Sequence, residues 1–98
     1  MSKIRLEVWP WLADALGKKG SRITVLEQET EDGATAGDLL KSVAARYPAL
    51  GQALFEPKTG QLCGYVAIMI NNQLAQSLQE APLEDGDTVT LLPFVDGG

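Results

Sequence analysis

The sequence predicts one α+β domain in which a single main helix packs across one face of a β-sheet. Alternating apolar and polar residues near both ends predict strands, and one central stretch repeats its apolar residues with helical spacing. The predicted order is strand, strand, helix, strand, short strand, strand, which is typical of α+β domains with one main helix. A length of 98 residues fits a single domain over residues 1–98.

The first two predicted strands form a hairpin. Ile4, Leu6 and Val8 alternate with charged residues, which predicts a half-buried strand. Trp9-Pro10-Trp11 ends this strand, because proline cannot donate to the ladder, and residues 11–16 are predicted as a short helical turn. A second strand follows over residues 22–28, with Ile23, Val25 and Glu27 expected on one face.

The clearest helix begins after Thr35. Thr35 is a plausible N-cap, and Asp38 stands three residues later, as in a capping box. Pro48 stops the helix near Tyr47, because the residue before proline disfavours helical backbone. The apolar stripe of this helix consists of Leu39, Leu40, Val43, Ala44 and Tyr47.

The second half of the chain contains the remaining strands. Leu50, Leu54 and Phe55 are expected to pack under a short helical turn, and residues 56–60 form a turn. Residues 65–70 predict a buried strand, residues 74–78 a short edge strand and residues 88–95 the last strand. Asn71-Asn72 and residues 83–87 are the turns between them.

Composition excludes several classes of function. Thirteen acidic against eight basic residues give a net charge of −5, so no basic footprint for nucleic acid is present. No apolar run reaches the length of a membrane span, and the N-terminus does not resemble a signal peptide. Cys63 is the single cysteine and histidine is absent, so neither an internal disulfide nor a metal site is expected. We therefore expect a cytoplasmic protein.

The residues do not suggest an enzyme. The sequence contains no nucleophile–base pair, metal cluster or phosphate loop of the kind that an enzyme of this size normally shows. The acidic side chains fall mostly in polar loops and are read as a solvated face.

Gly97-Gly98 at the end of the sequence is the candidate functional segment. Two glycines lack Cβ, so this backbone can enter a channel that side chains would block. Once coupled to a nucleotide, the terminal carboxylate becomes an electrophile that accepts sulfur or an amine. A merely frayed end is the alternative, and the residues alone do not decide between them.

The last strand supplies a candidate docking surface. Val89 and Leu91 fall on one face by alternation, and Leu92 and Phe94 fall on the other. If the first pair faces the helix, the second pair lies on the open sheet face beside the tail. The alternative, equally open here, is that Pro93 shifts the alternation and Phe94 belongs to the core.

The chain resembles the sulfur-carrier family that includes the molybdopterin synthase small subunit and the thiamine thiazole sulfur carrier. The segment Pro82-Leu83-Glu84-Asp85-Gly86-Asp87-Thr88-Val89-Thr90-Leu91-Leu92-Pro93 and the final Gly97-Gly98 carry the resemblance most sharply. Residues 66–71 and 38–40 are also similar to the family. The resemblance implies a ubiquitin-like β-grasp fold with a mixed sheet of four to five strands and a flexible tail over residues 96–98.

The resemblance also implies a function. A partner similar to ubiquitin-activating enzymes would adenylate Gly98 using ATP, which this chain does not itself bind. Sulfur would convert Gly98 to a thiocarboxylate, and an acceptor such as the molybdopterin synthase large subunit would take it. Gly97 would belong to the tail, and Leu92, Pro93, Phe94 and Asp96 would bind the partner.

The chain departs from the family pattern in two places. Leu92-Pro93-Phe94 stands where many molybdopterin carriers have two prolines, and Asp96 replaces a small residue. Molybdenum-cofactor synthesis is the first expectation. Cysteine, thiamine or other metabolite synthesis, and protein modification through Gly98, are the alternatives.

Overall fold

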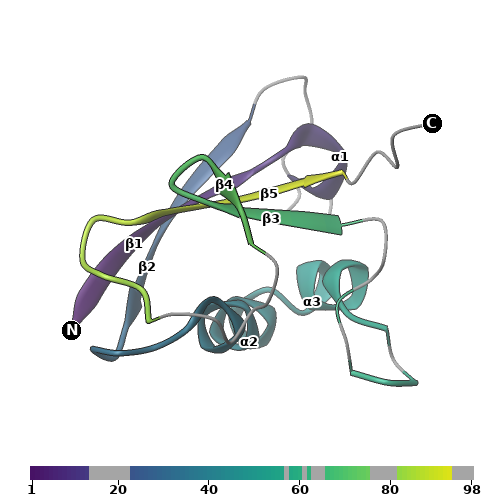
Figure 1. Cartoon of the computed structure of the whole chain (residues 1–98). Coiled ribbons are helices and arrows are strands. Elements are labelled where there is room, and N and C mark those ends of the chain that lie inside the picture. The colour runs from purple at the N-terminus through teal and green to yellow at the C-terminus, as the bar shows by residue number, and fades with distance from the viewer. Residues whose placement is uncertain (14–22, 57, 61, 63–65, 76–81, 94–98) are drawn as a thin grey trace.

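The computed structural model describes residues 1–13, 23–56, 58–60, 62, 66–75 and 82–93, and shows a five-stranded sheet with helices on one of its faces (Figure 1). The strands are β1 (Ser2–Val8), β2 (Thr24–Thr30), β3 (Val66–Ile70), β4 (Gln73–Leu74) and β5 (Thr88–Pro93). The helices are α1 (Pro10–Ala13), α2 (Ala36–Arg46) and α3 (Pro48–Leu54).

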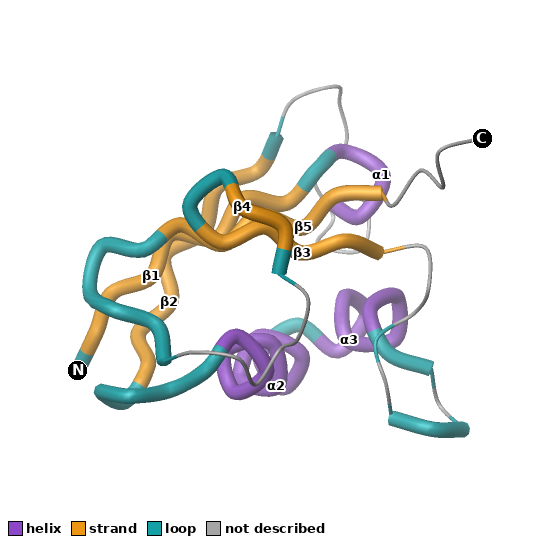
Figure 2. The backbone as a smooth tube through the Cα atoms, viewed as in Figure 1, coloured by secondary structure: helices purple, strands orange, loops and turns teal. Residues whose placement is uncertain are grey.

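The sheet is mixed, as predicted. Its strand order is β2-β1-β5-β3-β4, so the first and last strands of the chain lie side by side at its centre (Figure 2). β1 pairs antiparallel with β2 and parallel with β5, whereas β3 pairs antiparallel with both β5 and β4. The predicted hairpin of the first two strands is confirmed.

The capping box of the main helix is confirmed. Asp38 N donates to Thr35 Oγ1 at 3.3 Å, and Thr35 N donates to Asp38 Oδ2 at 3.1 Å. These two bonds satisfy backbone donors that the first helical turn leaves without partners. The helix ends at Arg46, and Pro48 then begins α3, because proline is well suited to a first helical turn.

The hydrophobic core lies between the sheet and these two helices. Each strand of the central pair contributes alternate residues, and α2 and α3 contribute their apolar stripes. The largest fully buried side chains are Ile4, Leu6, Val8, Leu12, Leu39, Leu40, Val43, Leu50, Leu54, Val89 and Leu91.

The second strand differs from its prediction. β2 runs two residues later than expected, over Thr24–Thr30, and its register pairs Leu26 with Leu6. Because Leu6 faces the helices, Leu26 shares that side and the neighbouring Val25 lies on the open face. Ile23 and Val25 do share a face, but their side chains are 44% and 45% exposed.

Smaller differences concern element ends. α1 begins at Pro10, one residue earlier than predicted, and β4 begins at Gln73 instead of Leu74. The Asn71-Asn72 turn is confirmed, with φ of +51° and +72°, a left-handed conformation that asparagine tolerates better than most residues. The predicted strand and helix residues at 14–16, 22, 65, 76–78 and 94–95 lie outside the described residues.

The packing of α3 against α2 depends on Gly51. A Cβ at this position would lie 2.7 Å from Ala44 Cβ, closer than real Cβ atoms approach. We expect Gly51→Ala to lower the free energy of unfolding by about 1–2 kcal/mol, because overpacking outweighs the gain in helix propensity. Urea denaturation measures this change. In the Ala44→Gly background the same substitution should cost less, and equal costs in both backgrounds would contradict the contact.

Candidate functional site

β5, the strand that precedes the tail, is held by β1 as far as Leu91 and by β3 as far as Pro93. Its pairing with β1 runs from Arg5↔Thr88 to Val8↔Leu91, and its pairing with β3 runs to Val66↔Pro93. Trp9 N also donates to Leu91 O at 3.0 Å, just beyond the end of β1. The backbone of β5 is therefore fixed up to the last residue that the structure describes.

The turn before β5 attaches it to β1 at the other end. Lys3 N donates to Asp85 Oδ1 at 2.7 Å, and Gly86 N donates to Lys3 O at 2.8 Å. Arg5 N donates to Asp87 O at 2.9 Å. Gly86 has a φ of +90°, which glycine adopts without steric cost. These bonds set the register in which β5 enters the sheet.

A side-chain clamp joins this turn to β3. Asn71 Nδ2 donates to Asp87 Oδ1 at 2.9 Å, and Asn71 Oδ1 accepts from Thr88 N at 2.9 Å. The second oxygen of Asp87 accepts from Glu84 N at 2.8 Å. One asparagine thus connects the β3–β4 turn to the start of β5, and its positive φ directs both amide atoms there.

The end of β5 lies beside α1 and the start of β3 (Figure 1). Five residues follow β5, and the predicted site residues among them are Phe94, Asp96, Gly97 and Gly98. These residues lie outside the part of the chain that the structure describes. Five fully extended residues span at most about 17 Å, which sets the distance over which Gly98 can act from the end of the sheet.

The docking interpretation required Val89 and Leu91 to face the helices, and the structure meets this condition. Val89 and Leu91 are fully buried on the helix side, and Leu92 is half-buried on the open face opposite Ala67. The pairing continues without a bulge through Pro93, so Pro93 does not shift the alternation within β5. The structure therefore places Leu92 on the open face.

Sequence reasoning missed other apolar side chains on this open face. Trp9 is 37% exposed and lies one residue beyond the paired register, beside Leu92. Met69 lies opposite Thr90, and Leu74 of β4 is 57% exposed opposite Met69. The faces of Met69 and Leu74 depend on the pairing of β3 with β5 and β4, which joins segments whose register the sequence alone does not give.

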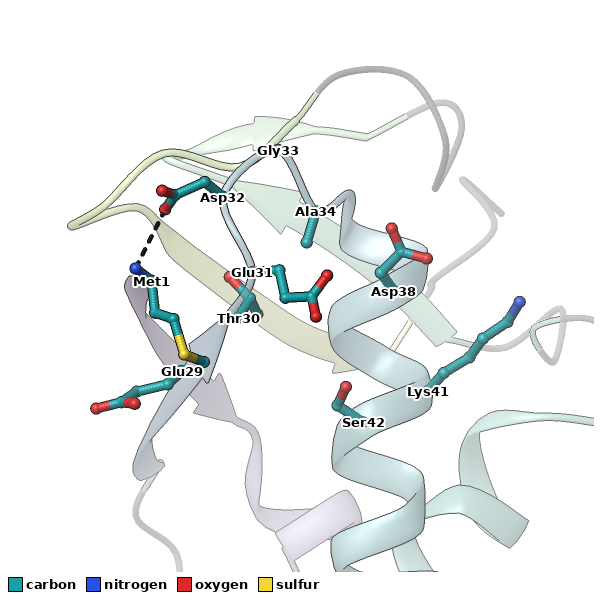
Figure 3. A pocket seen from close by; sticks show the side chains of 10 residues that line it. All are labelled: Met1, Glu29, Thr30, Glu31, Asp32, Gly33, Ala34, Asp38, Lys41 and Ser42. Carbon is teal, nitrogen blue, oxygen red and sulfur yellow. Dashed lines mark ion pairs between the residues drawn. The ribbon is translucent and has the colours of Figure 1, made fainter.

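A hollow of about 570 Å³ lies at the opposite end of the sheet (Figure 3). Since β1 and β5 are parallel, the Met1 end of β1 is remote from the end of β5. The Met1 amino group lies 3.5 Å from Asp32 Oδ1 at this hollow. Its lining residues are Met1, Glu29, Thr30, Glu31, Asp32, Gly33, Ala34, Asp38, Lys41 and Ser42. The hollow is therefore separate from the predicted tail site.

Neither a cluster of metal-binding side chains nor a membrane-spanning helix occurs among the described residues. No group of three or more histidine, cysteine, aspartate or glutamate side chains among them is arranged to hold a metal ion. No helix within the same ranges has the length and apolar character needed to cross a membrane. The described residues of the site thus supply a fixed strand end and an apolar face beside it.

This mixed sheet with helices on one face, and with its first and last strands paired in parallel at the centre, is a ubiquitin-like β-grasp fold. Proteins of this class that resemble the chain are small carriers and modifiers, not catalytic enzymes. The model of the ThiS family matches residues 14–98, and the chain belongs to that family.

Two curated relatives resemble the chain in sequence. Small archaeal modifier protein 3 of Haloferax volcanii is 36% identical over 70 residues, which cover 69% of this chain and 74% of the relative. The sulfur carrier protein CysO of Mycobacterium tuberculosis is 34% identical over 70 residues, covering 67% of this chain and 74% of the relative.

Solved structures resemble it over nearly the whole length. Small archaeal modifier protein 1 of H. volcanii is 27% identical with a TM-score of 0.81, covering 97% of this chain and 100% of that chain. CysO in the BexX/CysO complex of Amycolatopsis orientalis is 25% identical with a TM-score of 0.67, covering 97% and 99%. A relative of this fold therefore forms a complex with a partner protein.

The clamp at the start of β5 gives a stability prediction. Asn71→Ala removes both amide bonds and places alanine at φ +51°, so we expect the free energy of unfolding to fall by about 1–3 kcal/mol. A double-mutant cycle with Asp87→Ala, followed by urea denaturation, measures the shared part. Because Asn71 Nδ2 bonds Asp87 Oδ1 directly, the two costs should be coupled by at least about 0.5 kcal/mol, whereas the bond from Glu84 N adds only to the cost of Asp87→Ala. Full additivity would contradict the clamp.

Proposed function

We propose that the chain is a sulfur carrier whose reacting group is the carboxylate of Gly98. The observation that carries the proposal is the attachment of β5 to β1 up to Leu91 and to β3 up to Pro93, a few residues before Gly97-Gly98. A fixed strand end gives the tail a defined origin, and two glycines allow its backbone to enter another protein's site. Membership of the ThiS family and the likeness to CysO support the carrier chemistry.

The chemistry requires an activating partner. The Gly98 carboxylate attacks the α-phosphorus of ATP, pyrophosphate leaves, and an acyl-adenylate forms. A sulfur nucleophile then attacks the carbonyl carbon and AMP leaves, so that a thiocarboxylate remains. Transfer of this sulfur to an acceptor and addition of water return the carboxylate. We place these steps in the cytoplasm, where ATP is available, and assign ATP binding to the partner.

The pathway is a second part of the proposal. Molybdenum-cofactor synthesis, with a molybdopterin synthase large subunit as acceptor, was the first expectation from the sequence. The likeness to CysO, a sulfur carrier, does not favour this branch over cysteine, thiamine or other metabolite synthesis, which are the alternatives. Incubating the thiocarboxylate form with each candidate acceptor, and following loss of sulfur by intact mass, distinguishes these branches.

Protein modification is the alternative function. One relative, at 36% identity, is named small archaeal modifier protein 3, and this likeness supports the alternative. In this reaction a lysine amine, in place of sulfur, attacks the activated carbonyl of Gly98, and an isopeptide bond forms. Expression of the chain in its host, followed by a denaturing gel and digestion mapping, would detect Gly98 joined to lysines.

The tail gives the decisive test of the carrier function. Incubation with ATP, a sulfide source and the host's activating enzyme should add the mass of one sulfur in place of one oxygen. Fragment spectra must place the change at Gly98, because oxidised methionine or cysteine adds nearly the same mass. Deleting Gly98, or adding one residue after it, should abolish the modification and leave the unfolding midpoint unchanged. Sulfur transfer by either variant would refute the proposal, provided that the same enzyme is active on a control carrier.

The open face beside the tail gives a binding test. We propose that Leu92, Pro93, Phe94 and Asp96 contact the activating partner, with the exposed Trp9 as a further contact. Leu92→Ala and Phe94→Ala should each weaken binding by about 1 kcal/mol or more, measured by titration calorimetry. Lys41→Ala, an exposed truncation on α2, is the control and should bind as the unchanged chain does. Equal binding by all three variants would remove this face from the interface.

A further inference from the structure

β2 forms one edge of the sheet. All seven of its residues pair with β1, from Ser2↔Thr30 to Val8↔Thr24, and the strand order places no described strand on its other side. Edge strands expose backbone donors and acceptors that can pair with another chain, so proteins usually protect them with lysine, proline or a bulge. The β2 sequence, Thr-Val-Leu-Glu-Gln-Glu-Thr, contains neither lysine nor proline.

The register identifies the backbone groups that point outward. Arg5 N of β1 donates to Asp87 O, just before β5, and Trp9 N, just beyond β1, donates to Leu91 O of β5. The backbone N–H and C=O groups of odd-numbered residues of β1 therefore point to the β5 side, and those of even-numbered residues point to β2. Leu26 pairs with Leu6 and therefore bonds toward β1. Val25, Glu27 and Glu29 consequently direct their N–H and C=O groups to the outer edge.

The side chains of these same residues are exposed on the open face. Val25 is 45% exposed, Ile23 just before the strand is 44% exposed, and Glu27 and Glu29 are exposed as well. The edge therefore has two halves along its length: an apolar half at Ile23 and Val25, and an acidic half at Glu27 and Glu29.

Opposite charges stand across from each other on the open face of the hairpin. Lys3 and Arg5 of β1 lie opposite Glu29 and Glu27 of β2. Arg5 forms its ion pair with Glu7, at 3.2 Å, so that its charge is shared with another carboxylate. Opposite charges directly across a strand pair stabilise it and like charges destabilise it. A partner strand that places basic side chains opposite Glu27 and Glu29 would extend this pairing of opposite charges.

We propose that the outer edge of β2 binds an extended, basic segment of a partner protein as a sixth strand. Lysine or arginine of that segment would stand opposite Glu27 and Glu29, and apolar side chains opposite Ile23 and Val25. A hollow of about 390 Å³ lies along the acidic half, lined by Lys3, Glu27, Gln28, Glu29 and Arg46. On the helix side Arg46 Nη1 donates to Gln28 Oε1 at 3.3 Å, so that side favours uncharged residues.

The acidic charge disfavours a second copy of the chain as the occupant. Antiparallel pairing of two β2 strands about Glu27 places this glutamate against its own copy and Val25 against Glu29. Each copy also carries a net charge of −5. This inference uses no tail residue, so it does not depend on the proposed function.

A designed peptide tests the proposal. The probe is fluorescein-labelled and capped at both ends, with the sequence lysine, threonine, lysine, threonine, valine, threonine, valine. Paired antiparallel, its lysines stand opposite Glu29 and Glu27, and its valines opposite Val25 and Ile23. Fluorescence anisotropy should show saturable binding to the full chain, and a peptide with glutamate in place of lysine should bind at least about tenfold more weakly.

A matched pair of variants separates strand pairing from charge attraction. Glu27→Gln and Glu27→Pro remove the same negative charge, but only the proline variant also removes the outward N–H group. The neighbouring residues, whose N–H groups point toward β1, keep those groups in both variants. We expect Glu27→Pro to bind the lysine peptide at least about tenfold more weakly than Glu27→Gln does. Equal binding by both variants, each shown to be folded by circular dichroism, would overturn the proposal.

A second measurement leaves the protein unchanged, in case Glu27→Pro fails to fold. The lysine peptide is N-methylated on the amides that would face β2, which should weaken binding at least about tenfold. Unchanged binding of the methylated peptide would overturn the proposal. Analytical sedimentation gives a further test. If the free chain forms a dimer and Glu27→Gln strengthens that dimer, the proposal is overturned, because a second copy would then occupy the edge.

Discussion

The parallel pairing of β1 with β5 is the constraint on which the rest of the structure depends. These strands come from opposite ends of the chain, and their covered faces supply Ile4, Leu6, Val8, Val89 and Leu91 to the core. The connection between them must therefore cross the sheet, and α2 and α3 lie in that connection and cover one face (Figure 1). The Asp85–Asp87 turn sets the register by bonding to Lys3 and Arg5. A slip of one residue would turn the buried side chains of β5 to solvent, because side chains alternate with a period of two.

The arrangement leaves the second face of the sheet open, and the side chains there are not uniformly polar. Trp9, Val25, Met69, Leu74 and Leu92 share this face with charged residues of β1 and β2. Exposed apolar side chains on one face of a small protein are typical of contact surfaces. Leu92 lies at the end of β5, the strand that precedes the tail we propose to react, whereas Val25 lies at the free edge of β2. One open face thus offers two separate places for partners.

Much of the fold was predictable because its signals are local. Thr35, Asp38 and Pro48 define both ends of α2, and Asn71-Asn72 defines a turn whose positive φ values asparagine tolerates. The face of Ile23 and Val25 was not predictable from alternation alone, since it depends on the pairing of Leu26 with Leu6 across the hairpin. α3 was only suggested, because a short helix is held by packing such as the approach of Gly51 to Ala44. Of the predicted site residues, Leu92 was placed on the open face, and Phe94 to Gly98 remain predictions from the sequence.

The proposed chemistry explains why so little catalytic apparatus is needed in this chain. Activation of Gly98 is assigned to a partner, so the chain contributes a carboxylate, a narrow backbone and a limited reach from the end of β5. Distance and access are properties of the tail, whereas stability is a property of the core beneath the other face of the sheet. The two are therefore separable: a change in tail length alters the reach of Gly98 without exposing a core side chain. Conversely, the Asn71–Asp87 clamp influences the reaction only through the position at which β5 ends.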